Sequence, residues 1–217
     1  MFVLALDREK RPCRVRSSNA GQCLFSGIAS EEQTEKMLRE LRRPAFFSGW
    51  GVRTIADGEC CYNPMSYHNG SIWPHDNALI AWGLTDHRNK ELALEILNGL
   101  FDAATFLDLS RLPELFCGFE RRRGKAPTEY PVACSPQAWA AGSVFMLMQA
   151  CLGLTVRAAE SRIYFYYPAL PLPLERISLR NVPVGAARID LDIVRQDHTV
   201  AIEPKRQSGP VQIVLVA

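Results

Sequence analysis

Segments with the spacing of amphipathic helices alternate along this chain with segments that are apolar on every side. The segment after Ser30 has its apolar residues on one face, whereas the run 78–82 that follows Pro74 is apolar all round. The alternation repeats with an amphipathic segment at 90–107 and an apolar one at 138–152. An amphipathic helix lies on a surface and an all-apolar helix is enclosed. The pattern therefore predicts helical hairpins whose inner helices are buried between the outer helices and a central cavity.

Local signals predict where these helices begin and end. Ser30 followed by Gln33 is a capping box, and Pro44 ends the helix that it opens. Proline at position 74 suits a first helical turn, and Gly153 is placed to end the last helix.

The tail of the chain changes to short alternating or β-branched runs, separated by proline and glycine. In the run 188–193, apolar and charged residues alternate, as in a half-buried antiparallel strand. The expected strands are 163–167, 176–179, 188–194, 199–202 and 211–216, with a further pair at 2–6 and 13–16. We therefore predict a mainly α protein, with residues 1–160 forming a helical body and residues 161–217 a small antiparallel β module.

Composition bounds the class of protein. The chain has 217 residues, of which 47% are hydrophobic and 22% charged, as in a soluble globular protein. A net charge of +2 argues against nucleic acid or an anionic membrane as a partner. Seven cysteines without a C-x-x-C pair argue against a disulfide framework and a zinc site. We expect a cytoplasmic protein without a cofactor.

The segment 67–77 combines aromatic rings, imidazoles, amides and a carboxylate at the point where a helix opens. Such a mixture is typical of a sugar-binding cleft, because a pyranose has hydroxyl groups at its rim and C–H groups on its faces. Trp73 and Trp139 are candidate platforms for a sugar, although a buried tryptophan often belongs to a core. Asp76 either contacts substrate or complements the dipole of the helix that starts at Pro74.

Glu114 is the most pointed single candidate for catalysis. It follows a proline within the apolar stretch 112–116, and a carboxyl group in apolar surroundings is suited to act as a general base or acid. The alternative is a structural carboxylate that pairs with Arg111 or Arg121.

A metal site is not expected. His68 and His75 are seven residues apart, and Asp76 is the only other ligand close in sequence. This spacing does not match a zinc site.

Five blocks together resemble the C-terminal part of the amylo-alpha-1,6-glucosidase and glycogen-debranching family of glycoside hydrolases. They occur in the same order as in that family and cover about two thirds of the chain. The blocks are Ser-Asn-Ala-Gly at 18–21, Ser-Gly-Trp-Gly-Val-Arg-Thr at 48–54, the segment 63–77, Leu-Pro-Glu-Leu-Phe at 112–116, and Cys-Ser-Pro-Gln-Ala-Trp-Ala at 134–140.

The resemblance implies a partial (α/α)6 toroid and hydrolysis of an α-glucosidic bond, typically at an α-1,6 branch point of a glycogen-like glucan. It implies inversion with two carboxylic acids, one of which activates water while the other protonates the leaving oxygen. Within the Pro-Glu-Leu-Phe motif, Glu114 would be the general base. The residues of the glucose-binding cleft would be Tyr67, His68, Asn69, Trp73, Asp76, Gln137 and Trp139.

Members of that family are longer than this chain, and their general acid is an aspartate in a part without a counterpart here. Asp76 and Glu129 are the only nearby carboxylates available to replace it, and nothing in their motifs supports that role. We therefore expect the chain alone to be inactive, with an oligosaccharide or branched glucan as substrate and a missing N-terminal half or a second chain as partner. Two alternatives stay open: a non-catalytic carbohydrate-binding or scaffold module, and another toroid glycosidase specificity of the trehalose or mannosylglycerate type.

Overall fold

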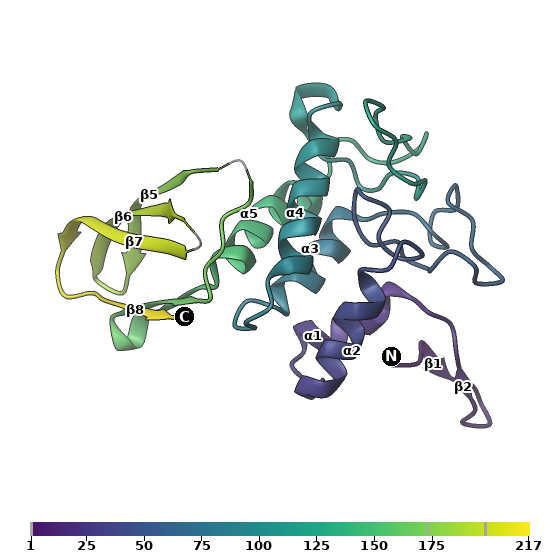
Figure 1. The fold of residues 1–217 in the computed structure, drawn as a ribbon, viewed down its shortest axis with the longest axis horizontal. Helices are drawn as coiled ribbons and strands as arrows, with labels where there is room; N and C mark the ends of the chain where they lie inside the picture. The colour runs from purple at the N-terminus through teal and green to yellow at the C-terminus, as the bar shows by residue number, and fades with distance from the viewer. Residues whose placement is uncertain (1, 173, 198) are drawn as a thin grey trace.

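The computed structural model describes residues 2–172, 174–197 and 199–217. Figure 1 shows helices in the middle of the molecule, a sheet at one end and long irregular loops at the other. The α-helices are α1 (Gln22–Phe25), α2 (Glu31–Leu41), α3 (Pro74–Trp82), α4 (Glu91–Ala104) and α5 (Ala138–Leu152), with short 3-10 turns at Ser18–Gly21, Asp108–Ser110 and Ala158–Glu160. The strands are β1 (Ala5–Leu6), β2 (Pro12–Cys13), β3 (Leu154–Arg157), β4 (Arg162–Tyr166), β5 (Arg176–Val184), β6 (Ala187–Gln196), β7 (Thr199–Ser208) and β8 (Gln212–Val216).

The predicted helix signals are confirmed. The Ser30 hydroxyl accepts a hydrogen bond from the Gln33 amide, and the Gln33 side chain accepts one from the Ser30 amide, so both halves of the capping box are present. Pro74 is in the first turn of α3. Gly153 ends α5 with a φ of 59°, a left-handed conformation that glycine adopts at little cost.

The main core surrounds α3, which packs against α1, α4 and α5. Ala78, Ile80 and Ala81 of α3 are completely buried, in agreement with the all-apolar character of this segment. A second cluster lies within the strand-rich tail and includes Phe165, Leu191 and Ile193. Burial of these two apolar clusters is the main favourable contribution to folding.

The tail contains two separate sheets. Strands β5, β6 and β7 form an antiparallel meander, whereas β3, β4 and β8 form a second sheet. In the second sheet β3 pairs antiparallel with β4, but β4 pairs parallel with β8, with Ile163 opposite Ile213. The module is thus not purely antiparallel, and β3 was not predicted.

The predicted fold class, a mainly α partial toroid, is wrong. Helices of all kinds make up 29% of the chain, strands make up 26% in three sheets, and the part that the structure describes contains only five α-helices. Two features explain the error. The stretches 42–73 and 105–137 between the helices are largely irregular, and strands β5 to β7 run for nine or ten residues each, longer than their alternating patterns indicated.

Helix α5 shows why the alternation of amphipathic and all-apolar segments led to a wrong prediction of the fold. Its apolar residues surround the whole helix, yet Phe145 is 78% exposed and Trp139 is 49% exposed. An apolar surface shows which sides of a helix can be buried, but not that another element covers them. Among the described residues, no helix combines the length and the apolar character that crossing a bilayer requires.

Candidate functional site

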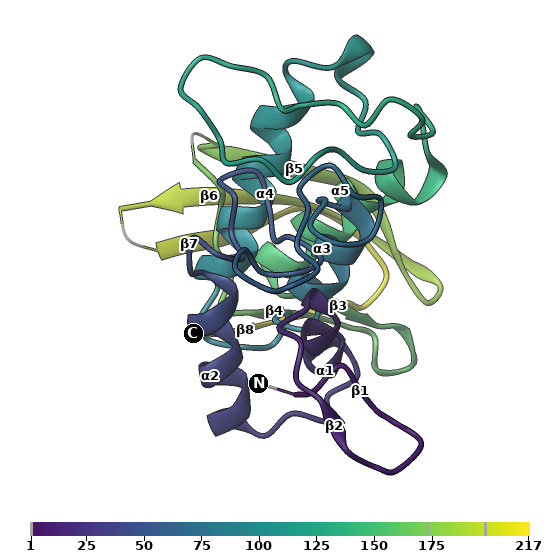
Figure 2. The same cartoon turned by 90° about the vertical axis from the view of Figure 1, so that its right-hand side faces the viewer.

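Single β-bridges gather the irregular loops at the end of the molecule that faces the viewer in Figure 2. Arg53 pairs with Ile72, Ile72 pairs with Phe116, and Phe116 pairs with Glu129. The Ile72 amide donates to the Phe116 carbonyl over 2.9 Å, and the Phe116 amide returns a bond of 3.1 Å. This short ladder brings the segment 67–73 beside Glu114, although the two are more than forty residues apart in the chain.

A cavity with a volume of 360 Å³ opens beside this ladder. It is lined by Ser18, Asn19, Thr54, Tyr67, His68, Trp73, His75, Asp76, Glu114 and Trp139. The walls therefore combine two carboxyl groups with aromatic and imidazole rings. These are the side-chain types that bind and cleave sugars.

Glu114 is 8% exposed and lies at the wall of this cavity. Its Oε1 accepts a hydrogen bond of 2.7 Å from the Tyr67 hydroxyl, and its Oε2 accepts one of 3.3 Å from the Cys134 amide. Among the described residues, no arginine forms an ion pair with it. Arg121 instead pairs with Asp102 over 2.8 Å and lies over the Trp50 ring. The alternative role for Glu114, a structural ion pair with Arg111 or Arg121, is thus not found among the described residues.

The two candidate tryptophans have different environments. Trp73 is only 7% exposed, and its indole N–H donates to the Ser71 hydroxyl and to the Tyr67 carbonyl. Trp139 is half exposed and stacks on His75. Trp139 is therefore the ring with free surface for a ligand, and Trp73 mainly positions its neighbours.

Asp76 occupies the first turn of α3, where its Oδ1 accepts a hydrogen bond of 2.8 Å from the Gln22 side chain. Its Oδ2 is buried without a hydrogen-bond partner among the described residues, and the same holds for Nδ1 of His75. Burial raises the pKa of Asp76, although the nearby Ser18 hydroxyl, His75 and the Gln22 amide moderate this rise. Burial also lowers the pKa of His75, which favours its neutral form.

The structure brings six of the eight residues predicted for the site to one cavity: Tyr67, His68, Trp73, Asp76, Glu114 and Trp139. Asn69 and Gln137 do not line it. The Asn69 backbone bonds to Ser66 and Asn63, and Gln137 caps α5 through its own side chain and lines a different hollow beside Phe145. Glu129, considered as a replacement acid, is exposed and also lies outside the cavity lining.

Four lining residues had no assigned role in the sequence analysis: Ser18, Asn19, Thr54 and His75. All four belong to blocks that resemble the glycosidase family, which was the available signal. Thr54 connects these blocks, since its carbonyl accepts from the Ser18 amide, its amide donates to the Ser71 carbonyl and its hydroxyl accepts from the Gly70 amide.

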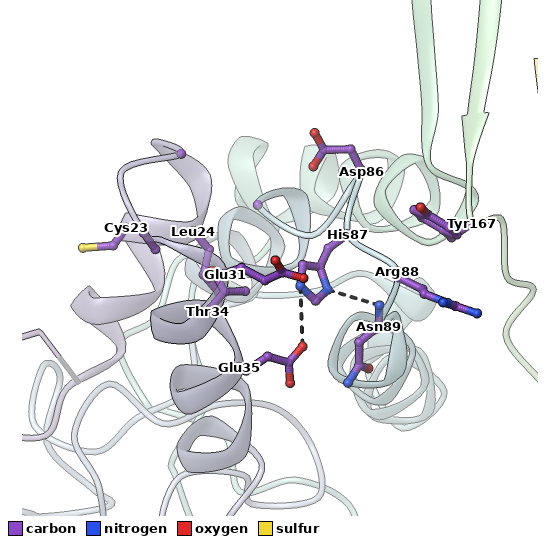
Figure 3. Close-up of a pocket in the computed structure, with 13 residues that line it drawn as sticks. Cys23, Leu24, Glu31, Thr34, Glu35, Asp86, His87, Arg88, Asn89 and Tyr167 are labelled. Carbon is purple, nitrogen blue, oxygen red and sulfur yellow. Dashed lines mark hydrogen bonds and ion pairs between the residues drawn. The ribbon is translucent and has the colours of Figure 1, made fainter. Parts of the chain in front are cut away.

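A larger cavity of 680 Å³ lies between α1, α2 and the connection from α3 to α4 (Figure 3). His87 lies 3.6 Å from Glu35 there and accepts a hydrogen bond from the Asn89 amide, while Asp86 and Arg88 are exposed. This cavity lacks a buried carboxyl group and a tryptophan, so the smaller cavity is the better candidate for sugar chemistry. Within residues 2–172, 174–197 and 199–217, no three histidine, cysteine, aspartate or glutamate side chains converge in a way that could hold a metal ion.

Comparison with known proteins gives a match to one family and a similarity to solved structures. Residues 1–109 match the family described as the mannosylglycerate hydrolase MGH1-like glycoside hydrolase domain. The match includes the segment 67–77 but ends before Glu114 and Trp139. No curated protein sequence matches the chain.

Among solved structures, the chain is similar to an uncharacterized conserved protein from Thermus thermophilus, with a TM-score of 0.51 and 16% sequence identity. The similarity covers 63% of this chain and 32% of that protein, so the chain spans about a third of the relative's length. At this identity the likeness concerns the fold alone.

The family match covers half of the chain and confirms the predicted class, a glycoside hydrolase, without supporting amylo-alpha-1,6-glucosidases in particular. The chain belongs to the mannosylglycerate hydrolase MGH1-like glycoside hydrolase family.

Proposed function

We propose that the cavity around Glu114 is the part of a glycoside hydrolase site that binds the sugar and activates water, with Glu114 as the general base of an inverting reaction. One observation carries this proposal: a nearly buried carboxyl group lies at the wall of an aromatic cavity with hydrogen-bond donors but no basic partner among the described residues. In an inverting hydrolase, such a carboxylate removes a proton from the water that attacks the anomeric carbon.

The cavity also limits the substrate. Its volume of 360 Å³ lies at the lower end of ligand pockets, which suits a single sugar unit rather than a long glucan segment. Trp139 offers an exposed ring for the C–H face of that sugar, and Asp76 lies in the lining of the same cavity. The proposed substrate is therefore a small α-glycoside, such as a mannosylglycerate-type glycoside or an α-1,6-linked glucoside.

The test compares the wild-type chain with Glu114→Gln on a panel of mannosylglycerate, isomaltose-type and trehalose-type glycosides, together with a branched glucan. Loss of the base is expected to lower kcat by roughly 10²- to 10⁴-fold on the preferred glycoside, measured together with the part that supplies the general acid. Glu129→Gln is the matched control, because it makes the same change at an exposed residue outside the cavity.

Labelling with a glycosyl epoxide provides a second measurement that does not need turnover. The carboxylate of Glu114 is expected to open the epoxide and form an ester on its own peptide, and mass spectrometry locates that ester. If the wild-type chain binds sugar without hydrolysis or labelling, and Glu114→Gln binds equally well, the catalytic proposal fails. A glycan-binding module would then explain the cavity.

A further inference from the structure

Tyr67 is tied to the start of α3 through its backbone. Its carbonyl oxygen accepts a hydrogen bond of 2.7 Å from the Ser71 hydroxyl and one of 3.1 Å from the indole N–H of Trp73. Ser71 is completely buried, and Trp73 is the residue that precedes the first turn of α3. The Cα of Tyr67 is therefore held by the same residues that begin the helix.

The Tyr67 ring is also confined by its neighbours. Three rings meet it at steep angles: His68 at 4.6 Å between centroids, Trp73 at 4.8 Å and Tyr130 at 5.6 Å. Edge-to-face contacts of this kind favour one orientation of an aromatic side chain. Rotation of the ring would break these contacts and the hydrogen bond of its hydroxyl group together.

The hydroxyl group of Tyr67 is directed at Glu114, not at the open cavity. It donates to Oε1 over 2.7 Å, a short distance typical of a bond to a charged acceptor. This hydrogen bond is the main reason that the pKa of Tyr67 rises to about 12, so the phenol keeps its proton, and its capacity to donate, at any physiological pH.

The two oxygens of Glu114 are held unequally. Oε1 is fixed by Tyr67, whereas the bond from the Cys134 amide to Oε2 is long at 3.3 Å. A carboxylate has about four acceptor positions, so Oε2 keeps capacity to accept a proton from water.

From this geometry we propose that Tyr67 is a positioning residue for catalysis, whose hydroxyl fixes Oε1 of Glu114 and so holds the carboxylate in the orientation in which Oε2 accepts the proton of the attacking water. This role rests on the proposed function of Glu114 and differs from the direct sugar contact that the sequence suggested for Tyr67. Loss of this donor would leave Oε1 without the hydrogen bond that fixes it, so the carboxylate would rotate more freely and Oε2 would be oriented for proton transfer less often.

The test measures how fast the glycosyl epoxide forms its ester on Glu114, in the wild type, in Tyr67→Phe and in Tyr62→Phe. This measurement does not require turnover, and it reports how well the carboxylate is oriented toward a bound sugar. Tyr62→Phe is the matched control, since the Tyr62 hydroxyl lies in the same loop but contacts the Gly118 carbonyl at 3.4 Å.

In Tyr67→Phe, the rate of ester formation at a saturating epoxide concentration is expected to fall about tenfold, because the carboxylate loses the hydrogen bond that orients it. The half-saturating concentration should stay within about twofold of the wild type. Tyr62→Phe should follow the wild type, and equal rates for Tyr67→Phe and the wild type would overturn the inference.

Kinetics on the preferred glycoside separate this inference from the proposed function. A positioning role predicts a fall in kcat and a KM within about twofold of wild type. A raised KM with unchanged kcat would instead make Tyr67 a sugar contact. Full activity of Glu114→Gln would refute the function of Glu114, while the rate of ester formation in Tyr67→Phe would still decide whether Tyr67 orients the carboxylate.

Discussion

The indole of Trp139 stacks on the imidazole of His75, with ring centroids 4.0 Å apart and planes only 12° from parallel. The two rings come from different helices, α5 and α3, so their contact joins the two sides of the cavity. His75 covers one face of the indole while half of Trp139 stays exposed. The exposed part is therefore a flat apolar surface that α3 holds in place.

Truncation of this surface should weaken sugar binding. Trp139→Ala is expected to lower the affinity for the preferred glycoside by about tenfold, since a lost aromatic contact costs on the order of 1.4 kcal/mol. Trp139→Phe should retain most of the affinity. Isothermal calorimetry on the sugar measures both, with Phe145→Ala as the control on the exposed side of the same helix. Equal losses in Trp139→Ala and Phe145→Ala would show that α5 as a whole, not this stack, determines binding.

Asp76 should stabilise sugar binding at the expense of folding stability. Because burial raises its pKa above the ordinary value of 3.8, ionisation of Asp76 favours the unfolded chain. The wild type thus loses stability from this group as the pH rises above 3.8 and through the folded pKa. Asp76→Asn removes the charge but keeps an acceptor for Gln22.

We expect Asp76→Asn to melt at a higher temperature than the wild type at neutral pH and to bind the sugar more weakly. The two melting temperatures should converge in acid, where both side chains are neutral. Calorimetry across this pH range measures both melting temperatures. A lower melting temperature of Asp76→Asn at neutral pH would show instead that the ionised carboxylate is well solvated or paired.

Local chemistry explains which elements could be predicted. The capping box of Ser30 and Gln33, the proline at 74 and the glycine at 153 each act within one helical turn, and each has the predicted role. Most of the site was also predictable, because Tyr67, His68, Trp73 and Asp76 lie in one crowded segment and Glu114 lies in a short motif.

The errors concern relations between distant segments. The apolar surface of α5 predicted enclosure, but Phe145 is exposed because no described element packs there. Thr54 lies at the cavity because hydrogen bonds connect it to Ser18 and to the segment 70–71. A periodic sequence pattern does not indicate hydrogen bonds of this kind. The hydrogen bond between Tyr67 and Glu114 likewise depends on the bridge between Ile72 and Phe116, which forms only in the folded chain.

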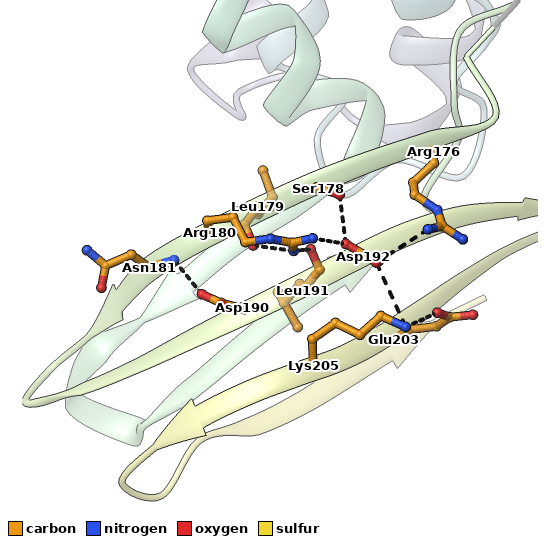
Figure 4. A network of polar contacts seen from close by, with 10 residues as sticks. All are labelled: Arg176, Ser178, Leu179, Arg180, Asn181, Asp190, Leu191, Asp192, Glu203 and Lys205. Carbon is orange, nitrogen blue, oxygen red and sulfur yellow. Dashed lines mark hydrogen bonds and ion pairs between the residues drawn. The ribbon is translucent and has the colours of Figure 1, made fainter.

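Asp192, in the β5–β6–β7 sheet, contributes to folding stability with a pH dependence opposite to that of Asp76 (Figure 4). The Ser178 hydroxyl donates to it over 2.7 Å, and Arg180 approaches the same oxygen at 2.7 Å. These contacts hold the pKa of Asp192 below its ordinary value of 3.8. The resulting stability is therefore present above that pH and is lost as the pH falls through the folded pKa.

Asp192→Asn should unfold at a lower urea concentration than the wild type at neutral pH, and the difference should shrink in strong acid. Asp190→Asn is the matched control, because its side chain accepts only the Asn181 amide in this network. If both variants lose equal stability at neutral pH, the cations around Asp192 contribute nothing measurable.

Gly118 lies where two loops of the site approach most closely. A Cβ atom at this position would lie 1.7 Å from the Gly70 carbonyl oxygen, which belongs to the backbone and cannot turn away. Gly118 also donates its amide hydrogen to Pro64 and accepts from Arg53, so the segment has little room to shift. Gly118→Ala should therefore push Glu114 away from Tyr67.

The expected cost is at least about 1–3 kcal/mol of stability, with a loss of glycosidase activity that exceeds the loss of folded protein. Gly142→Ala in α5 is the matched control, since its Cβ would meet nothing within 4 Å and alanine favours a helix by about 1 kcal/mol. Urea unfolding of the two variants should thus give changes of opposite sign. Wild-type stability and activity in Gly118→Ala would mean that the loops can separate freely, and that their close approach does not hold Glu114 in place.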